Sequence, residues 1–272
     1  MPKVTKISGS ALVLGQFFYE CSGNYYHFLI DTLPRLELLR RSGLNLQDFD
    51  HILMHPPKTA FEREGLERFG IDPQKIRALS AQEHLEFDQL TVTSNFWRFG
   101  PWVADFLKQE FLAGRPTQRP HRRLYVTRKG ASSRRVVNEA AFVNLLSAYG
   151  FETVDPADYT LQEQALLFSE AEVVVGPHGA GLSNIAFCQP GTRVLEIRPS
   201  DQVHMHWDVF WRLSNLGNLP FSLYISPSVN RQKDMAVDLA DFRQALETVM
   251  ASLDNTQSVV RLRKATPQVL AA

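Results

Sequence analysis

The stretch from Glu172 to Asn184 reads EVVVGPHGAGLSN, and it decides how the second half of the chain folds. Its unbroken apolar run, Val173–Val175, predicts a strand buried inside a parallel sheet. A Gly-rich turn follows this strand, and the residues after the turn predict a short helix. Strand, turn and helix form one βα unit, and doubly wound sheets bind ligands at the carboxyl ends of such strands.

The same alternation extends outward from this unit along the second half of the chain. We predict further strands at 123–127, 151–154, 193–197 and 221–225. We predict helices at 138–149, from residue 160 onward, at 205–213 and at 240–253. Asn138 is placed to cap the first of these helices, and Thr160 and Glu163 have the spacing of a capping box. The alternation indicates an α/β fold with a parallel sheet and helices on both of its faces.

The first part of the chain predicts fewer elements. A helix over about Tyr25–Arg41 contains Pro34, which should kink it or split it into two pieces. Ser22 or Asn24 is placed to cap it. We predict strands at 51–54 and 89–93 and helices at 58–69 and 102–112.

A polar, Pro-bearing run at 113–120 predicts a linker between two domains. We therefore expect an N-terminal α/β domain over 1–115 and a C-terminal one over 121–256. The mixed composition of residues 257–272 predicts a poorly ordered tail.

Charge and cysteine content exclude several classes of protein. The chain has 272 residues, with 29 Lys and Arg against 29 Asp and Glu, and this zero net charge argues against bulk nucleic-acid binding. Its two cysteines, Cys21 and Cys188, lack metal-ligand spacing, so we expect no metal site. The chain contains no apolar run long enough to span a membrane and does not begin like a signal peptide. We expect a cytoplasmic protein, at most in peripheral contact with the inner membrane.

The Gly-rich turn has the chemistry of an anion site. Glycines let the backbone approach a ligand closely, and the N–H groups and dipole of the following helix attract negative charge. The turn matches neither the dinucleotide fingerprint, nor the P-loop, nor the nucleophile elbow of hydrolases. The residues expected to bind the anion are His178, Gly179, Ala180, Gly181, Leu182 and Asn184. The alternative is a tight turn whose glycines only satisfy backbone geometry.

A basic loop follows the strand at 123–127 and lies at the same edge of the predicted sheet. Residues 128–135 read RKGASSRR, with four cations and two hydroxyls, a composition that suits a diphosphate. Arg128, Arg134 and Arg135 are the candidate phosphate ligands. The alternative is a solvated, charged loop.

Glu196 belongs to the next predicted strand, also toward this edge. A carboxylate there can accept hydrogen bonds from the two ribose hydroxyls of a nucleotide. A salt bridge to Arg193 or Arg198 is an equal alternative.

In the first part of the chain, His27, Asp31 and Arg35 are spaced by four residues and share one helical face. A His–Asp pair can act as an oriented general base, in which the carboxylate fixes the imidazole tautomer. The alternative is a buried network in which Arg35 neutralises the other two residues. Asn24 and Arg35 are therefore candidates for acceptor binding or for a structural role.

Three blocks of sequence, in this order, resemble glycosyltransferase family 61. The first is Asn24–Leu36, the second is Arg134–Glu139, and the third runs from Gln164 to Phe187 around His178–Leu182. Together they span about Gly23 to Pro199.

The resemblance implies a GT-B fold, with two Rossmann-like α/β domains facing a cleft. The chain departs from a typical member in its N-terminal domain, 1–115, which is short for a full Rossmann-like domain and is therefore expected to be reduced. It implies inverting, metal-independent transfer of a sugar from a nucleotide-sugar donor, expected to be UDP-linked, which is a substrate and not a cofactor. The acceptor would be a hydroxyl of a glycan or lipid-linked glycan in capsular or surface polysaccharide biosynthesis. Arg128, Arg134, Arg135 and the turn would stabilise the leaving diphosphate, and His27 or Asp31 would be the base.

Two other functions fit the same residues. One is a catalytically inactive module that still binds a nucleotide-sugar, and the other is a different enzyme of this fold, such as an epimerase or a hydrolase. Acceptor-dependent release of nucleotide from a sugar donor separates the transferase from both.

Overall fold

The computed structural model describes residues 3–15, 23–78, 80, 82–93, 100–116, 118–202 and 208–251. The chain divides into two compact units, Met1–Ala113 with Thr160–Glu163, and Gly114–Tyr159 with Gln164–Ala272. The predicted tail at 257–272, the predicted cap Ser22 and the predicted helix start at Met205 lie outside the described residues.

The first unit contains a parallel sheet with strand order β3-β2-β1-β4. Its strands are β1 (Val4–Val13), β2 (His51–Leu53), β3 (Ile76–Arg77) and β4 (His84–Val92). The predicted strands at 51–54 and 89–93 are confirmed as β2 and the end of β4. Strand β1 was not predicted, because only its last residues are buried and its register shifts between Ile7 and Ser10, where Gly9 has a φ of 102°.

The predicted split of the first helix at Pro34 is confirmed. A π-helix, η2 (His27–Thr32), precedes the α-helix α1 (Pro34–Arg41). Proline lacks an N–H group and clashes with the carbonyl group four residues earlier. The wider π turn avoids both problems: the Leu33 N–H donates to the Phe28 carbonyl at 3.0 Å, and Pro34 becomes the first residue of α1.

The two other predicted helices of the first unit are present as α-helices. They are α2 (Ala60–Arg68) and α3 (Trp102–Leu112). A capping box begins α2, in which Thr59 and Glu62 satisfy each other's backbone N–H groups.

The second unit contains a parallel sheet with strand order β6-β5-β7-β8-β9. Its strands are β5 (Arg122–Val126), β6 (Phe151–Val154), β7 (Ala171–Pro177), β8 (Arg193–Pro199) and β9 (Phe221–Ser226). All five predicted strands are present, so the predicted α/β fold is confirmed. The chain first moves from β5 outward to β6 and then reverses past β5 to β7, which makes the β5/β7 boundary a topological switch point.

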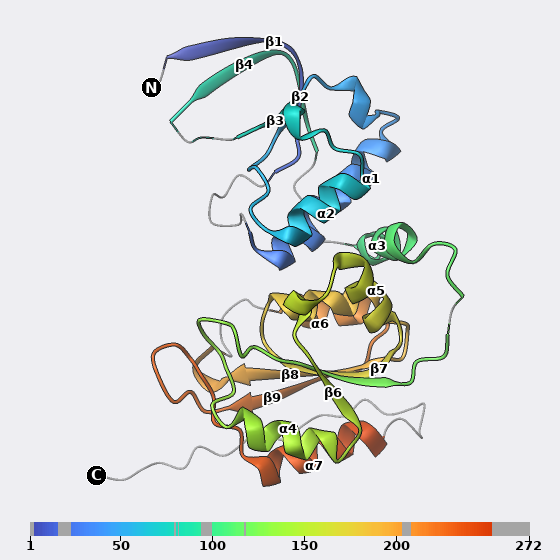
Figure 1. Ribbon diagram of the computed structural model, residues 1–272, viewed down its shortest axis with the longest axis vertical. Coiled ribbons are helices and arrows are strands. Elements are labelled where there is room, and N and C mark those ends of the chain that lie inside the picture. The colour runs from blue at the N-terminus through green and yellow to red at the C-terminus, as the bar shows by residue number, and fades with distance from the viewer. Residues whose placement is uncertain are drawn as a thin grey trace. The chain divides into compact units, whose positions relative to one another are not determined.

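Helices cover both faces of this sheet. They are α4 (Glu139–Ser147), α5 (Leu161–Ser169), α6 (Val209–Leu216) and α7 (Leu239–Ala251). Figure 1 shows α4 and α7 on one face and α5 and α6 on the other.

The two predicted helix caps of this unit, at the starts of α5 and α4, differ in their hydrogen bonds. The predicted capping box of α5 is confirmed, with the Thr160 N–H donating to the Glu163 carboxylate at 2.8 Å and the Glu163 N–H to the Thr160 hydroxyl at 3.2 Å. Asn138 is the N-cap residue of α4, as predicted, but its side chain makes no capping hydrogen bond; it instead exchanges two hydrogen bonds with the backbone of Val237, at 2.8 and 3.0 Å. This tertiary contact uses both polar atoms of the amide.

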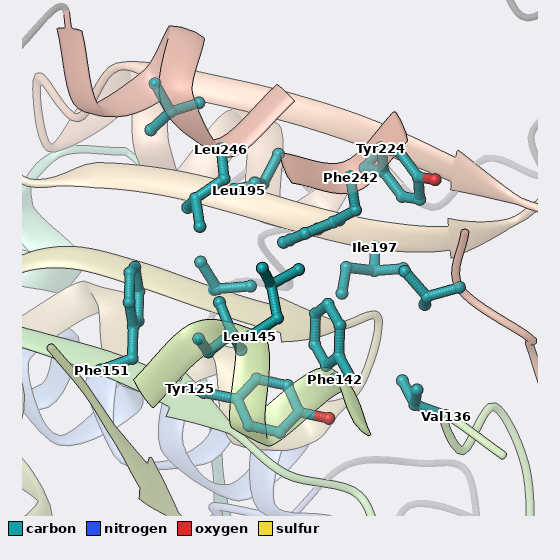
Figure 2. Packing of buried hydrophobic residues seen from close by; sticks show 14 of the residues in the cluster. Tyr125, Val136, Phe142, Leu145, Phe151, Leu195, Ile197, Tyr224, Phe242 and Leu246 are labelled. Carbon is teal, nitrogen blue, oxygen red and sulfur yellow. The ribbon is translucent and has the colours of Figure 1, made fainter. Parts of the chain in front are cut away.

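A hydrophobic core of the second unit lies between the sheet and helices α4 and α7 (Figure 2). Four aromatic rings meet there edge to face. Phe142 contacts Tyr125 and Phe242, with ring centroids 5.2 and 4.7 Å apart, and Tyr224 contacts Phe242 at 5.0 Å. Such pairs add to the free energy gained from burying the rings, so this cluster fixes α4 and α7 on the sheet.

We expect Phe142→Ala to destabilise the second unit by about 3–5 kcal/mol, because Phe142 is fully buried and its removal leaves a cavity. Denaturant unfolding followed by circular dichroism measures this loss. Phe142→Leu, which fills most of the space, should lose clearly less. Equal stability of Phe142→Ala and the unaltered protein would contradict this account of the core.

Candidate functional site

The candidate site of the second unit lies at the switch point between β5 and β7. The basic loop leaves β5 after Val126, and the Gly-rich turn leaves β7 after Pro177. Because the two strands are parallel neighbours, both segments start from the same edge of the sheet. This is the position at which open α/β sheets bind their ligands.

Glycine 179 brings the two segments into contact. A Cβ atom at Gly179 would lie 1.7 Å from Nη1 of Arg128, so the arginine occupies the space that any side chain would need. The turn also packs on the tip of β5, where a Cβ atom at Gly181 would lie 3.1 Å from Val126 Cγ1. The glycines therefore permit a close contact between the turn and the basic loop.

Two of the three guanidinium nitrogens of Arg128 are hydrogen-bonded within the basic loop. Its Nε and Nη2 atoms donate to the Ser133 carbonyl at 3.3 and 3.1 Å. Its Nη1 atom makes no hydrogen bond to any residue that the structure describes. Burial and the nearby charge of Arg134 lower the pKa of Arg128 to about 10, which Asp234 partly opposes.

Arg134 is the second cation of the site. Burial lowers its pKa, and the charge of Glu196 acts in the opposite direction. Its backbone has a φ of 58°, the left-handed region that a residue with a side chain rarely adopts. Two partly buried arginines thus lie close together, although their charges repel each other.

A later segment of the chain, residues 228–238, holds the basic loop in place. The Arg134 N–H donates to the Gln232 carbonyl at 3.0 Å, and Val136 and Met235 form an isolated β-bridge. We call this segment the latch. It fixes the loop through backbone hydrogen bonds, and it therefore fixes the unusual conformation of Arg134.

Arg135 is engaged with the latch. Its backbone N–H and its guanidinium group donate to the two carboxylate oxygens of Asp234, at 2.9 and 2.7 Å. Asp234 is fully buried and also accepts from Asn230 at 3.0 Å. The hydrogen bond from Arg135 is the largest cause that lowers the pKa of Asp234.

Three ionisable residues at the carboxyl ends of β7 and β8 form a buried network. The Glu196 carboxylate is fully buried; it accepts from Arg198 Nη2 on both oxygens at 2.9 Å, and it hydrogen-bonds His178 Nδ1. Burial is the largest cause that lowers the pKa of His178, while Glu196 raises it. Of the two interpretations of Glu196, the structure therefore shows the salt bridge, with Arg198 as the partner and not Arg193.

The helix after the turn is a 3-10 helix, η6 (Ala180–Phe187). Its first hydrogen bond runs from the Leu182 N–H to the Gly179 carbonyl at 2.9 Å. The N–H groups of Ala180 and Gly181 precede that bond and donate to no carbonyl group in the described part of the chain. They are available as donors to a bound anion.

Asn184 faces into the protein. Its amide donates to the Gln164 side chain at 2.8 Å and to the Gly181 carbonyl at 3.1 Å, and the residue is fully buried. Leu182 is also buried. These two predicted ligands hold the turn from within: the amide nitrogen of Asn184 and the N–H group of Leu182 both donate to other groups of the protein.

The first unit contains the predicted His–Asp pair. His27 Nδ1 and Asp31 Oδ2 are 2.7 Å apart, with side chains 34% and 19% exposed. The side chain of Asn24 accepts from the N–H of Tyr26 at 3.0 Å at the start of this helical segment.

Arg35 is hydrogen-bonded to the backbone of Asp31. It is buried, and it donates to the Asp31 carbonyl at 2.9 Å and to the Thr93 hydroxyl at 3.1 Å. Burial lowers its pKa, and Asp31 raises it. Arg35 thus links the π-helix to the residue that follows β4.

Sequence reasoning missed two acidic residues that shape the candidate site. Asp234 lies 99 residues from its partner Arg135, so no local pattern could reveal it. Glu139 accepts from the hydroxyls of Tyr125 at 2.9 Å and Thr127 at 2.5 Å, and so holds the start of the basic loop. Its position in the first turn of α4 was the available signal, but that position is also favourable for helix stability alone.

Two negative findings concern only the described residues. No group of three or more His, Cys, Asp or Glu side chains is arranged to hold a metal ion. No helix combines the length and apolar character needed to cross a bilayer.

The chain is an α/β protein in which two partly buried arginines, Arg128 and Arg134, lie at the switch point of a parallel sheet. The model of the family Glycosyltransferase 61 matches residues 25–195, more than half of the chain. The chain belongs to glycosyltransferase family 61, as the three sequence blocks predicted, and it is a glycosyltransferase. No curated protein matches it significantly.

We expect Asp234→Asn to lower the thermal stability of the protein and to speed hydrogen exchange at the backbone amides of Arg134 and Arg135. A carboxyl group whose pKa is lowered by folding stabilises the fold above its unfolded pKa and loses this effect as the pH falls. The difference in Tm should therefore be full at neutral pH and should shrink below about pH 4.

Glu86→Gln is the matched control, because Glu86 pairs with Lys6 on an exposed surface. It should change Tm little. A Tm difference for Asp234→Asn that stays constant down to strongly acidic pH would contradict the ion pair as its cause.

Proposed function

We propose that the chain is an inverting, metal-independent glycosyltransferase that uses a nucleoside-diphosphate sugar, with UDP as the nucleotide. The sugar would pass to a hydroxyl of a glycan or lipid-linked glycan, in capsular or surface polysaccharide biosynthesis. The observation that carries the donor site is the contact of Arg128 with Gly179, beside Arg134, at the switch point of a family 61 chain.

A diphosphate would offset the positive charge that Arg128 and Arg134 bring to this edge of the sheet. Arg128 and Arg134 bring two partly buried positive charges together, and an anion between them would offset their repulsion. Each guanidinium group can donate two parallel hydrogen bonds to a phosphate. The N–H groups of Ala180 and Gly181 add neutral donors from the turn.

The same groups suit the departure of the nucleotide. In this reaction an acceptor oxygen bonds to the anomeric carbon while the bond to the diphosphate oxygen breaks, and the electron pair leaves with the nucleotide. Fixed cations and N–H groups stabilise the negative charge that develops on the leaving diphosphate in the transition state more than they stabilise the charge of the intact donor. Four of the predicted donor ligands would support this site indirectly, because they hydrogen-bond to other parts of the protein: Arg135, Leu182, Asn184 and Glu196.

The acceptor proton needs a base, and the His27–Asp31 pair is our candidate. Asp31 holds Nδ1 of the imidazole, so Nε2 is the ring nitrogen that would take the proton. The partial exposure of His27 suits contact with a substrate. A GT-B arrangement, in which the smaller N-terminal unit presents this pair to a cleft, is part of the proposal.

The deciding experiment measures release of UDP from a panel of UDP-sugars, with and without glycan acceptors. Release that depends on the acceptor supports the transferase. Binding of UDP without turnover for any acceptor favours the inactive module. Conversion of the sugar with no release of UDP favours an epimerase.

We expect Arg128→Ala and Arg134→Ala each to weaken UDP binding roughly ten- to a hundredfold, the usual effect of losing a charged hydrogen bond. Calorimetric titration measures this. Arg122→Ala is the matched control, because Arg122 lies at the opposite end of β5, paired with Glu152 and Glu170. Equal weakening by all three substitutions would mean that overall charge, not this site, binds the nucleotide.

We expect Asp31→Asn to lower kcat by roughly a hundredfold while the affinity for UDP stays unchanged, because the pair acts on the acceptor proton. Steady-state kinetics with a saturating donor measures this. His27→Gln should lower kcat at least as much. Wild-type turnover in either variant would remove that residue from the mechanism.

A further inference from the structure

The sheet of the first unit has a switch point of its own. The chain runs from β1 to its neighbour β2, continues outward to β3, and then returns past β1 to β4, so the strand order reverses at the boundary between β1 and β4. The carboxyl ends of these two strands are therefore the expected ligand edge of this sheet. Thr93, which directly follows β4, lies at that edge and is buried.

Three hydrogen bonds connect this edge to the imidazole of His27. Arg35 Nη1 donates to the Thr93 hydroxyl at 3.1 Å, and Arg35 Nε donates to the Asp31 carbonyl at 2.9 Å. The Asp31 carboxylate is in turn 2.7 Å from Nδ1 of His27. Because the nitrogens of a guanidinium group lie in one rigid plane, Arg35 fixes the backbone of Asp31 relative to the end of β4.

The choice of an arginine at this position indicates more than packing. Arg35 is only 2% exposed; burial lowers the pKa of its guanidinium group, and the charge of Asp31 raises it. An apolar side chain could fill such a buried position, and replacing buried charged groups by apolar ones is often neutral or stabilising. An apolar residue could not, however, bond to the backbone of the residue that orients His27.

The local geometry leaves His27 able to react. The side chains of His27 and Asp31 are partly exposed, whereas the other residues of the π-helix are buried: Phe28, Leu29, Ile30 and Thr32. Nε2 of His27 makes no hydrogen bond to any residue in the ranges that the structure describes. π-Turns of this kind occur frequently at functional sites.

We propose that Arg35 and Thr93 are positioning residues, which hold Asp31 at the carboxyl edge of β4 so that its carboxylate keeps His27 in the Nδ1–H form. A carboxylate can only accept a hydrogen bond, so the shared proton lies on Nδ1 and Nε2 is the basic nitrogen. This inference rests on the proposed role of His27 and Asp31 as the base. Arg35 and Thr93 act through that pair and do not themselves touch the reacting atoms.

The test uses two substitutions of Thr93, because Arg35→Ala would leave a large buried cavity and threatens folding. Thr93→Val keeps the shape of the side chain but removes the hydroxyl that accepts from Arg35, and Thr93→Ser keeps the hydroxyl. We expect Thr93→Val to lower kcat roughly tenfold with unchanged affinity for UDP, because a small displacement of the base slows proton transfer. Thr93→Ser should retain most of the turnover. Steady-state kinetics with a saturating donor and calorimetric titration of UDP measure the two quantities.

Thr192→Val is the matched control. Thr192 is also buried, and its hydroxyl donates to the Ala171 carbonyl at 2.6 Å, at the amino ends of β7 and β8. This substitution likewise removes one buried hydroxyl from a hydrogen bond, so it should lower Tm by a comparable amount while kcat stays unchanged.

A second readout does not depend on turnover. The ¹⁵N chemical shifts of the His27 ring report which nitrogen carries the proton, and the His27 signals are assigned by their absence in His27→Gln. We expect the unaltered protein and Thr93→Ser to show the Nδ1–H form. Thr93→Val should show a mixture of the two tautomers, because Asp31 is no longer held in place.

The outcomes separate this inference from the proposed function. If Thr93→Val keeps the kcat or the His27 ring shifts of the unaltered protein, while His27→Gln loses turnover, the inference is overturned and the base assignment stands. Equal loss of kcat in Thr93→Val and Thr192→Val would also overturn it, since lower stability would then be the cause. Full turnover in His27→Gln, or no acceptor-dependent release of UDP by the unaltered protein, would overturn the proposed base and this inference together.

Discussion

The contact between the Arg128 guanidinium group and the backbone of Gly179 organises the ligand edge of the second unit. It joins the loop that leaves β5 to the turn that leaves β7, and it does so only because residue 179 has no side chain. The contact also places a partly buried cation beside Arg134, where the two charges repel each other. A fold that keeps such an arrangement gives up some electrostatic stability, which is a common property of sites that bind an anion.

The rest of the second unit supplies the rigidity that this arrangement needs. The aromatic cluster around Phe142 fixes α4 against the sheet, and Glu139 at the start of α4 holds the hydroxyl of Thr127 just before Arg128. On the other side, Asp234 in the latch binds both the backbone and the side chain of Arg135. Arg134 lies between these two anchors, so its left-handed backbone is maintained by its neighbours and not by its own preference.

The two candidate histidines, His27 and His178, are each hydrogen-bonded to a carboxylate, but they differ in how deeply they are buried. In each, Nδ1 of the imidazole faces a carboxylate, Asp31 for His27 and Glu196 for His178. The side chain of His27 is about one-third exposed, whereas that of His178 is buried and its carboxylate partner is bound by Arg198. An accessible pair suits exchange of a proton with a substrate, and a buried one suits a fixed hydrogen bond.

The sequence by itself determined the features that depend on near neighbours. Hydrophobic runs predicted the five strands of the second unit, the spacing of Thr160 and Glu163 predicted a capping box, and Pro34 predicted the break in the first helix. The three ordered blocks also predicted the family. Each of these signals lies within a few residues of the feature that it predicts, because periodicity, capping and proline sterics act over one or two turns of chain.

Only the tertiary structure decided which side chains meet. It paired Glu196 with Arg198 and His178, Arg135 with Asp234, and Asn138 with the backbone of Val237, although the sequence allowed other roles for each. It also made the helix after the turn a 3-10 helix and included β1, whose outer half has no clear apolar pattern. Charged and amide groups bond to whichever partner the fold brings near, often about a hundred residues away, and burial then fixes the choice because an unpaired buried polar group is too costly.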